Sequence, residues 1–175
     1  MTKLHNYNGR YCETEYENAF LSFLEEAGWS YLPGSSLPRT SMRDVLYIDD
    51  MEYFLNKTNP DLTADEIQQI MDTVRLVGAE SDFATLHKVY GWMVNGIQFT
   101  PQSGLPIMVN LIDFENPEKN VFRAVNQFIV EYTNNGQTEN RRPDILLFVN
   151  GIPLCIVELK NPADGNATIY GAWEQ

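Results

Sequence analysis

Three charged residues flank two apolar segments near the C-terminal end of the chain. Asp144 precedes the first segment, and Glu158 and Lys160 follow the second. A charge at the end of a buried strand is costly unless it is paired or binds a metal. Two carboxylates with a backbone carbonyl form the hard oxygen site that Mg²⁺ prefers, and a nearby lysine can orient or deprotonate an attacking water. The pattern indicates metal-dependent hydrolysis of a phosphate ester.

A simpler explanation of these charges is that a Glu-x-Lys sequence at a strand end is usually a solvated salt bridge. Two features favour the site instead. Pro143 directly precedes Asp144, and the segment 154–157 before Glu158 is continuously apolar. A strand of this kind is expected in a sheet interior, where charge without a role is rare.

The dipeptide Asn150-Gly151 separates the two apolar segments and is a strong signal for a two-residue hairpin turn. A strict two-residue turn sets Asp144 opposite Val157 and, because side chains alternate along a strand, off the face of Glu158. One extra residue, in a three-residue loop or a bulge near Ile152-Pro153, sets Asp144 opposite Glu158 instead. We predict this irregularity, since it brings the charged groups to one end of the sheet.

The segment 141–162 contains Arg-Arg-Pro-Asp, then Leu-Phe-Val-Asn-Gly-Ile-Pro-Leu, then Val-Glu-Leu-Lys-Asn-Pro. This run resembles the PD-(D/E)XK nuclease superfamily, and more narrowly the N-terminal endonuclease domain of the type I restriction enzyme R subunit. Weaker similarity extends to residues 121–128 and to the N-terminal helix. The resemblance implies an α/β fold, with a restriction-endonuclease-like mixed central sheet flanked by helices and a helical segment inserted after the first helix.

The resemblance also implies an activity, that of a type I site-specific deoxyribonuclease, which is a hydrolase. Asp144 and Glu158 would be metal ligands, the backbone carbonyl of Leu159 would assist them, and Lys160 would be the catalytic lysine. The expected cofactor is Mg²⁺, for which Mn²⁺ can substitute. ATP would enter only through motor domains that this chain lacks.

Two further site residues follow from the resemblance. Nucleases of this superfamily often add a carboxylate from the first helix, and Glu17 is the expected one because it shares the apolar stripe of Phe20 and Leu24. The other glutamates of the first turns are explained by the helix dipole. In the family, a Gln followed four residues later by a Tyr helps to shape the site, and Gln175 is the candidate for that Gln.

The chain is expected to form one nuclease domain over residues 1–175, as a fragment of a larger motor and nuclease subunit. It contains no phosphate-binding loop and therefore no ATPase. We expect a helical insertion over about 40–95, a catalytic sheet over about 96–160 and the start of a truncated helix over 166–175. Apolar spacing and capping signals predict four helices, over residues 13–27, 44–57, 63–76 and 82–94.

Composition sets wider bounds on the class of protein. Hydrophobic residues make up 43% of the 175 residues, which is typical of a globular chain. No apolar run reaches the ~18 residues of a membrane-spanning helix. The first residues lack the apolar core of a signal peptide, and two cysteines are too few for a disulfide scaffold. These features predict a cytoplasmic protein with no membrane partner.

The net charge of −12 argues against autonomous, tight DNA binding, because phosphate neutralisation supplies much of that affinity. One interpretation is that the chain does not bind DNA. The other is that its basic residues act locally while other parts of a larger enzyme hold the substrate. The resemblance favours the second interpretation, with double-stranded DNA and the methyltransferase and specificity subunits of a restriction complex as partners.

The leading hypothesis is a Mg²⁺-dependent endonuclease domain that cuts double-stranded DNA when coupled to an ATP-driven translocase. One alternative is a non-catalytic docking module of nuclease fold that links the motor to partner subunits. A different enzyme on the same fold, such as a repair nuclease, is the third possibility. The three charges at Asp144, Glu158 and Lys160 argue for catalysis, because a docking module has no need of them.

Overall fold

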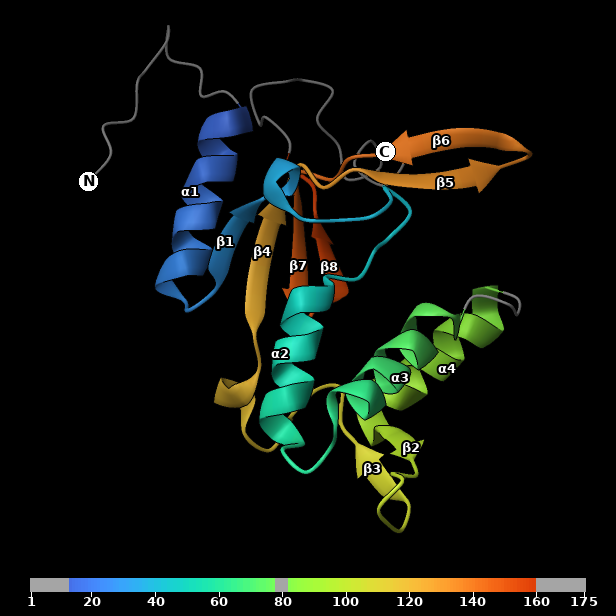
Figure 1. The fold of residues 1–175 in the computed structure, drawn as a ribbon. Helices are drawn as coiled ribbons and strands as arrows, with labels where there is room; N and C mark the ends of the chain where they lie inside the picture. Colours follow the sequence, from blue (N-terminus) through green and yellow to red (C-terminus); the bar gives the residue numbers. More distant parts are fainter. Residues whose placement is uncertain (1–12, 78–81, 160–175) are drawn as a thin grey trace, which may run out of the picture. The chain divides into compact units, whose positions relative to one another are not determined.

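The computed structural model describes residues 13–77 and 82–159, and these residues form two compact units. Among the described residues, unit 1 comprises 13–45, 122–148 and 153–159. Unit 2 comprises 46–77, 82–121 and 149–152. The helices α1–α4 and strands β1–β8 are labelled in Figure 1.

Unit 1 is built on a mixed four-stranded sheet with the strand order β1-β4-β7-β8. β1 runs parallel to β4, with Ser30 opposite Arg123 and Pro33 opposite Asn126. The arrows of β7 and β8 point in opposite directions, as a hairpin requires (Figure 1). The strands are β1 (Ser30–Pro33), β4 (Phe122–Asn126), β7 (Ile145–Val149) and β8 (Ile152–Val157). The mixed α/β fold confirms the expected class.

The helix α1 (Glu13–Glu26) packs on this sheet through its apolar stripe. Leu21 and Leu24 are buried in one cluster with Ala124 of β4 and Ile145 of β7. The helix ends at Glu26, and Gly28 just beyond it has a positive φ of 94°, the left-handed conformation typical of the residues that terminate a helix. The predicted helix over 13–27 is confirmed, because both its apolar spacing and its glycine stop are local signals.

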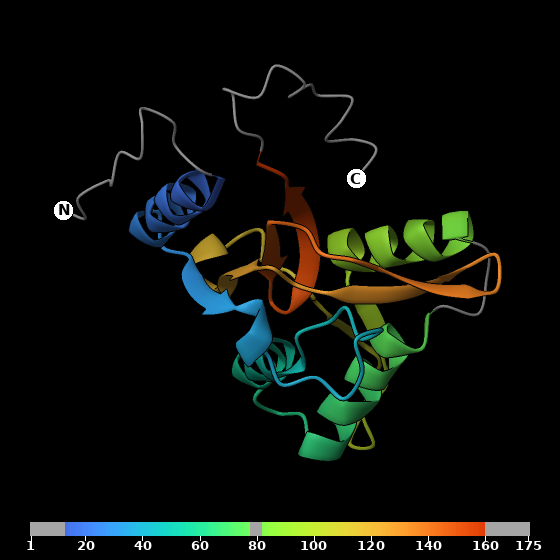
Figure 2. The same cartoon turned by 90° about the horizontal axis from the view of Figure 1, so that it is seen from above.

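The strands β5 (Val130–Asn134) and β6 (Gln137–Arg141) form a separate antiparallel ribbon that also belongs to unit 1. Asn135 and Gly136 make its turn, with φ values of 49° and 79°. The ribbon, drawn in orange, extends away from the four-stranded sheet in both views (Figures 1 and 2). Its turn is the same two-residue type as a type I′ hairpin, for which Asn-Gly is the preferred sequence.

Unit 2 contains α2 (Ile48–Thr58), α3 (Ala64–Arg75) and α4 (Asp82–Asn95), which confirm the helical character expected over about 40–95. α3 begins with the predicted capping box, in which Thr63 Oγ1 accepts from the Glu66 backbone and Glu66 Oε2 accepts from the Thr63 backbone. α2 begins four residues later than predicted. The buried core of unit 2 is Met51, Phe54, Leu55, Ile67, Ile70, Met71, Val74, Ile97, Val109, Leu111 and Ile152.

The expected catalytic sheet over about 96–160 needs correction in its membership. β2 (Ile97–Phe99) and β3 (Ile107–Val109) pair with each other in a two-stranded sheet of unit 2. β1 supplies the edge strand that the prediction lacked. The reason is that short apolar runs reveal a strand but not its partner, which is chosen by contacts far along the chain. None of the described helices is long and apolar enough to cross a membrane.

The turn between β7 and β8 belongs to unit 2 and carries a buried polar side chain, Asn150, which is 1% exposed. Asn150 Oδ1 accepts a hydrogen bond from the Val121 backbone at 2.7 Å. Its Nδ2 donates to the Leu111 carbonyl at 2.9 Å and to Asn120 Oδ1 at 2.8 Å. A Cβ added to Gly151 would overlap the carbonyl oxygen of Tyr47. The dipeptide therefore serves as an internal anchor of unit 2 as well as a turn.

Candidate active site

Asp144 lies directly before β7, and its half-buried carboxylate contacts the backbone that follows β8. Its Oδ2 accepts a hydrogen bond from the Leu159 backbone N–H at 2.7 Å. Because that N–H belongs to the peptide that links Glu158 to Leu159, this peptide lies beside the Asp144 carboxylate. The ends of the two hairpin strands therefore meet at the expected charged residues.

Side-chain packing shows which face of the hairpin the two carboxylates share. The turn at Asn150-Gly151 has two residues, both with positive φ (50° and 76°), which excludes the three-residue loop. Ile145 and Val157 nevertheless pack in one cluster on the α1 side of the sheet. A strict two-residue turn would put these two residues on opposite faces. The packing supports the predicted bulge, and alternation then puts Asp144 and Glu158 on one face.

Glu158 is half-buried and lies within electrostatic range of Arg141 at the end of β6. The pKa of Arg141 is raised, chiefly by its hydrogen bond to the Tyr132 hydroxyl and then by the charges of Glu139 and Glu158. Arg141 Nε lies 3.3 Å from the Tyr132 hydroxyl oxygen. A guanidinium held in this way keeps positive charge near the second carboxylate.

Glu17 of α1 is turned towards the C-terminal end of β4, in the inward direction expected from its place on the apolar stripe. Its Oε1 accepts from Asn126 Nδ2 at 2.6 Å, and its Oε2 accepts from Gln127 Nε2 at 3.2 Å. The Gln127 backbone N–H donates to the Asp144 carbonyl at 3.0 Å. Gln127 thus links Glu17 to Asp144. It adopts a positive φ of 52°, a strained conformation that for a residue other than glycine often marks a functional region.

Tyr31 of β1 extends this hydrogen-bond network, because its hydroxyl donates to Asn126 Oδ1 at 3.1 Å. The pKa of Tyr31 is raised by burial and further by the negative charge of Glu17. The hydroxyl therefore stays protonated and can act as a donor. Sequence reasoning missed the amides at 126 and 127 and this tyrosine, since only the parallel pairing of β1 with β4 brings them together.

The described residues contain no group of three or more His, Cys, Asp or Glu side chains that could hold a metal ion. The donors expected from the sequence are the carboxylates of Asp144 and Glu158 together with backbone carbonyls such as that of Leu159, and their role as ligands stays a prediction. These are all oxygen donors, which suits Mg²⁺ rather than a softer metal. Lys160 and Gln175 lie outside the described residues, and their roles stay predictions.

An open cleft of about 730 Å³ in unit 1 adjoins this network. Asn126, Gln127 and Arg142 line it together with residues of β1 and of the segment 34–42. Arg39 in its wall is structural: its guanidinium donates to the Ile129 carbonyl at 2.8 Å and lies 4.0 Å from the centre of the Phe128 ring. Burial lowers the pKa of Arg39. Sequence analysis did not find the cleft, because its walls come from distant segments.

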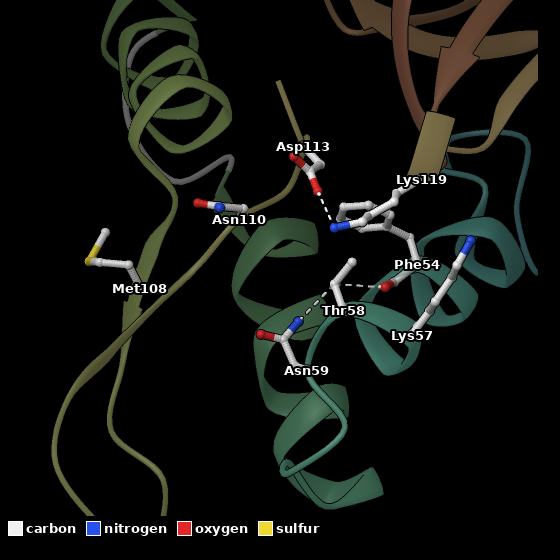
Figure 3. A pocket seen from close by; sticks show the side chains of 8 residues that line it. All are labelled: Phe54, Lys57, Thr58, Asn59, Met108, Asn110, Asp113 and Lys119. Atoms are coloured by element: carbon white, nitrogen blue, oxygen red, sulfur yellow. Dashed lines mark hydrogen bonds and ion pairs between the residues drawn. The ribbon is translucent and has the colours of Figure 1, made fainter. Parts of the chain in front are cut away.

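A second pocket, of about 370 Å³, lies within unit 2 (Figure 3). Its one carboxylate, Asp113, is already occupied: Oδ1 accepts from the Asn116 backbone at 2.9 Å, and Oδ2 lies 3.7 Å from Lys119 Nζ. The pKa of Asp113 is lowered, first by the hydrogen bond from Asn116. The pocket also contains Lys57 but no second carboxylate, and it therefore does not resemble a metal site.

Comparison with known proteins relates the sequence to one family. Residues 10–175 match the family model described as the type I restriction enzyme R protein N terminus. The putative type I restriction enzyme MjaIXP endonuclease subunit of Methanocaldococcus jannaschii is 37% identical over 156 residues, or 83% of this chain and 15% of that protein. The type I restriction enzyme HindI endonuclease subunit of Haemophilus influenzae is 32% identical over 177 residues, or 93% of this chain and 16% of that protein. The chain thus spans less than a fifth of the length of these relatives.

Proposed function

This chain belongs to the type I restriction enzyme R protein N-terminus family, and from this premise we propose that it is a Mg²⁺-dependent endonuclease domain. It hydrolyses phosphodiester bonds of double-stranded DNA in the cytoplasm. Cleavage is coupled to an ATP-driven translocase that the matched segment does not include. The methyltransferase and specificity subunits of the restriction complex are its protein partners.

One observation carries this proposal: the hydrogen bond between the Leu159 backbone and the Asp144 carboxylate, at 2.7 Å. It supports a donor set made from the two ends of the hairpin, in which Asp144, Glu158 and the Leu159 carbonyl would hold Mg²⁺. The ion, when bound, supplies a Lewis acid that stabilises negative charge on the phosphate. The family relationship supports the endonuclease assignment independently of this geometry.

The residues of the chain have distinct roles in the proposed reaction. Asp144 is held at its carboxylate by the Leu159 N–H and at its carbonyl by the Gln127 N–H. This double attachment limits the movement of the first ligand. Lys160 orients the attacking water or accepts its proton, a role that rests on the resemblance and on its place two residues after Glu158.

Titration calorimetry with Mn²⁺ and Mg²⁺ tests the metal site directly. We expect binding to the parent chain that Asp144→Ala and Glu158→Ala each abolish. Glu52→Ala, which removes an exposed carboxylate from α2 of the other unit, is the matched control and should bind like the parent. Metal binding that survives both site substitutions in folded protein would contradict the proposed ligands. Cleavage of supercoiled plasmid by the longer subunit carrying the same substitutions then tests the activity.

The docking-module alternative is favoured by one observation, the exposed apolar side chains of β8. Leu154 is 46% exposed and Ile156 is 63% exposed, which is unusual for neighbouring apolar positions on a strand. A surface of this kind is suited to a protein partner. If the folded parent chain bound no metal, the docking function would become the better explanation.

A further inference from the structure

The ribbon formed by β5 and β6 has an exposed tip that the proposed chemistry does not use. Its strands pair over five residues each, from Val130 opposite Arg141 to Asn134 opposite Gln137. At roughly 3.4 Å per residue, the paired strands are roughly 17 Å long. The ribbon extends away from the four-stranded sheet in both views (Figures 1 and 2).

The tip of the ribbon, residues 133–138, is exposed, polar and uncharged, with the sequence Thr-Asn-Asn-Gly-Gln-Thr. This neutral tip belongs to a chain with 24 acidic and 12 basic residues. Thr133 and Thr138 are directly opposite each other on one face. Hydroxyl and amide groups can donate hydrogen bonds to phosphate oxygens and base edges without the repulsion that a carboxylate would meet.

The one carboxylate of β6 is held by hydrogen bonds from its neighbours in the ribbon. Glu139 accepts hydrogen bonds from the Tyr132 hydroxyl at 2.7 Å and from Asn134 Nδ2 at 3.0 Å. These two bonds, and then the charge of Arg141, lower the pKa of Glu139. Its negative charge is therefore held within the ribbon, beside a guanidinium.

The base of the ribbon leads directly into the candidate active site. β6 ends at Arg141, and Asp144 follows three residues later. The exposed Arg142 lies between them and lines the open cleft of unit 1. The Glu131 backbone N–H donates to the Met42 carbonyl at 2.9 Å, which ties the base of the ribbon to another wall of that cleft. Neutral donors, arginines and carboxylates therefore follow one another along this surface.

We propose that the β5–β6 ribbon binds in a groove of duplex DNA and so positions the phosphodiester backbone at Asp144 and Glu158. This inference rests on the proposed function and adds a DNA contact to it. The major groove, about 12 Å wide and about 8.5 Å deep, admits a two-stranded ribbon. The exposed Thr, Asn and Gln side chains of the tip contact sugar–phosphate oxygens and base edges there.

A protein partner is a poorer fit to the same surface. Protein interfaces are enriched in aromatic residues, Met and Arg at their centres. The tip over 133–138 contains none of these, and the one aromatic ring of the ribbon, Tyr132, lies opposite Glu139 in the middle of the ribbon, where its hydroxyl donates to that carboxylate. The composition of the tip therefore favours a nucleic acid.

The test changes charge at the tip and measures duplex binding by the whole chain. The variant Thr133→Lys/Thr138→Lys adds two cations on one face of the ribbon, and Thr133→Glu/Thr138→Glu adds two anions. Gln69→Lys/Thr73→Lys, on the exposed surface of α3 in the other unit, is the matched control. The anisotropy of a short fluorescein-labelled duplex in Ca²⁺ gives the affinity at several salt concentrations.

Two added phosphate contacts make the slope of log K against log salt steeper by about 1.8. The ratio of the duplex affinity of the Thr133→Lys/Thr138→Lys variant to that of the parent should therefore fall by about twelvefold between about 50 and 200 mM salt. The glutamate ribbon should bind more weakly than the parent, and the α3 control should show little change in slope. Equal slopes for the lysine ribbon and the control would overturn the proposal.

A cross-link gives a second and independent readout. In a chain with Cys12→Ser and Cys155→Ser, a benzophenone on Thr138→Cys should cross-link to duplex DNA, whereas the same group on Thr73→Cys should not. Absence of the cross-link, as expected for a ribbon that binds protein, would also overturn the proposal. Mn²⁺ titration of the ribbon variants separates this failure from that of the nuclease proposal, because the ribbon lies outside the metal ligands.

Discussion

Exchanging Asn150 for aspartate tests whether the hairpin turn is a buried polar anchor of unit 2. Asn150 is 1% exposed, and its amide nitrogen donates to the Leu111 carbonyl and to Asn120 Oδ1. Aspartate has the same shape and keeps the bond from the Val121 N–H. It replaces the two donor contacts by contacts between oxygen atoms.

The expected cost follows from these contacts. Each lost hydrogen bond costs about 1 kcal/mol, and a buried acceptor left without its donor adds about 1 kcal/mol or more. We expect Asn150→Asp to lower the free energy of unfolding of unit 2 by roughly 3 to 5 kcal/mol at neutral pH. The sign of the pH dependence is also determined. Burial raises the pKa of the new carboxyl in the folded state, so the stability of the variant falls as the pH rises above about 4.

A matched control exists in the other hairpin. Asn135 has the same place in its turn and nearly the same backbone, with φ of 49° against 50° for Asn150, but it is exposed. Asn135→Asp should change the free energy of unfolding by no more than about 0.5 kcal/mol. Urea unfolding followed by circular dichroism and tryptophan fluorescence measures both variants. If the two variants differed by less than about 1 kcal/mol at neutral pH, the anchor role of Asn150 would be refuted.

Three further predictions concern a glycine, a helix cap and the link to the candidate site. In urea unfolding, Gly151→Ala should destabilise the protein by at least about 2 kcal/mol more than Gly136→Ala. Both glycines have a positive φ, but only a Cβ at position 151 would meet backbone atoms. Hydrogen bonds from the Thr63 backbone and other donors lower the pKa of Glu66. The ionised Glu66 carboxylate therefore stabilises the fold fully above the pKa of the unfolded state, and this stabilisation is lost as the pH falls through the lower pKa of the folded state. Glu66→Gln should reduce this acid-side loss of stability in pH-dependent unfolding. Gln127→Gly relieves the strained φ but removes the side-chain hydrogen bond to Glu17 of the first helix. It should weaken Mn²⁺ binding in calorimetry about tenfold, as the loss of residues that hydrogen-bond to metal ligands does at other sites. Unchanged affinity would contradict the positioning role of Gln127.

Local patterns allowed much of unit 1's hairpin and most of the helices to be predicted. The capping box at Thr63 and the glycine stop at Gly28 depend on neighbours within a few residues, and both are present in the structure. The convergence of Asp144 with the backbone after Glu158 follows from a short hairpin with one irregularity. The inward direction of Glu17 follows from its place on an apolar stripe.

Other features depend on contacts that no local pattern reveals. The segment 134–140 has the polar composition typical of a surface loop, yet cross-strand pairing makes most of it a ribbon. The apolar residues of the segment 121–131 are compatible with a single strand, but β4 ends at Asn126, Gln127 has a positive φ, and β5 begins at Val130. Strand propensity alone cannot distinguish these arrangements, because it reports a preference for extended backbone and not the partner that completes the hydrogen bonds.

The sequence by itself determined the residue types of the site and the order in which the hairpin presents them, because alternation, turn chemistry and capping act over short distances. Only the tertiary structure decided that Glu17 reaches Asn126, 109 residues away, and that Asn150 is buried against Leu111 and Asn120. Hydrogen bonds of this kind form when separate elements pack. They satisfy groups that burial would otherwise leave unpaired, and the choice among partners is made by the whole fold.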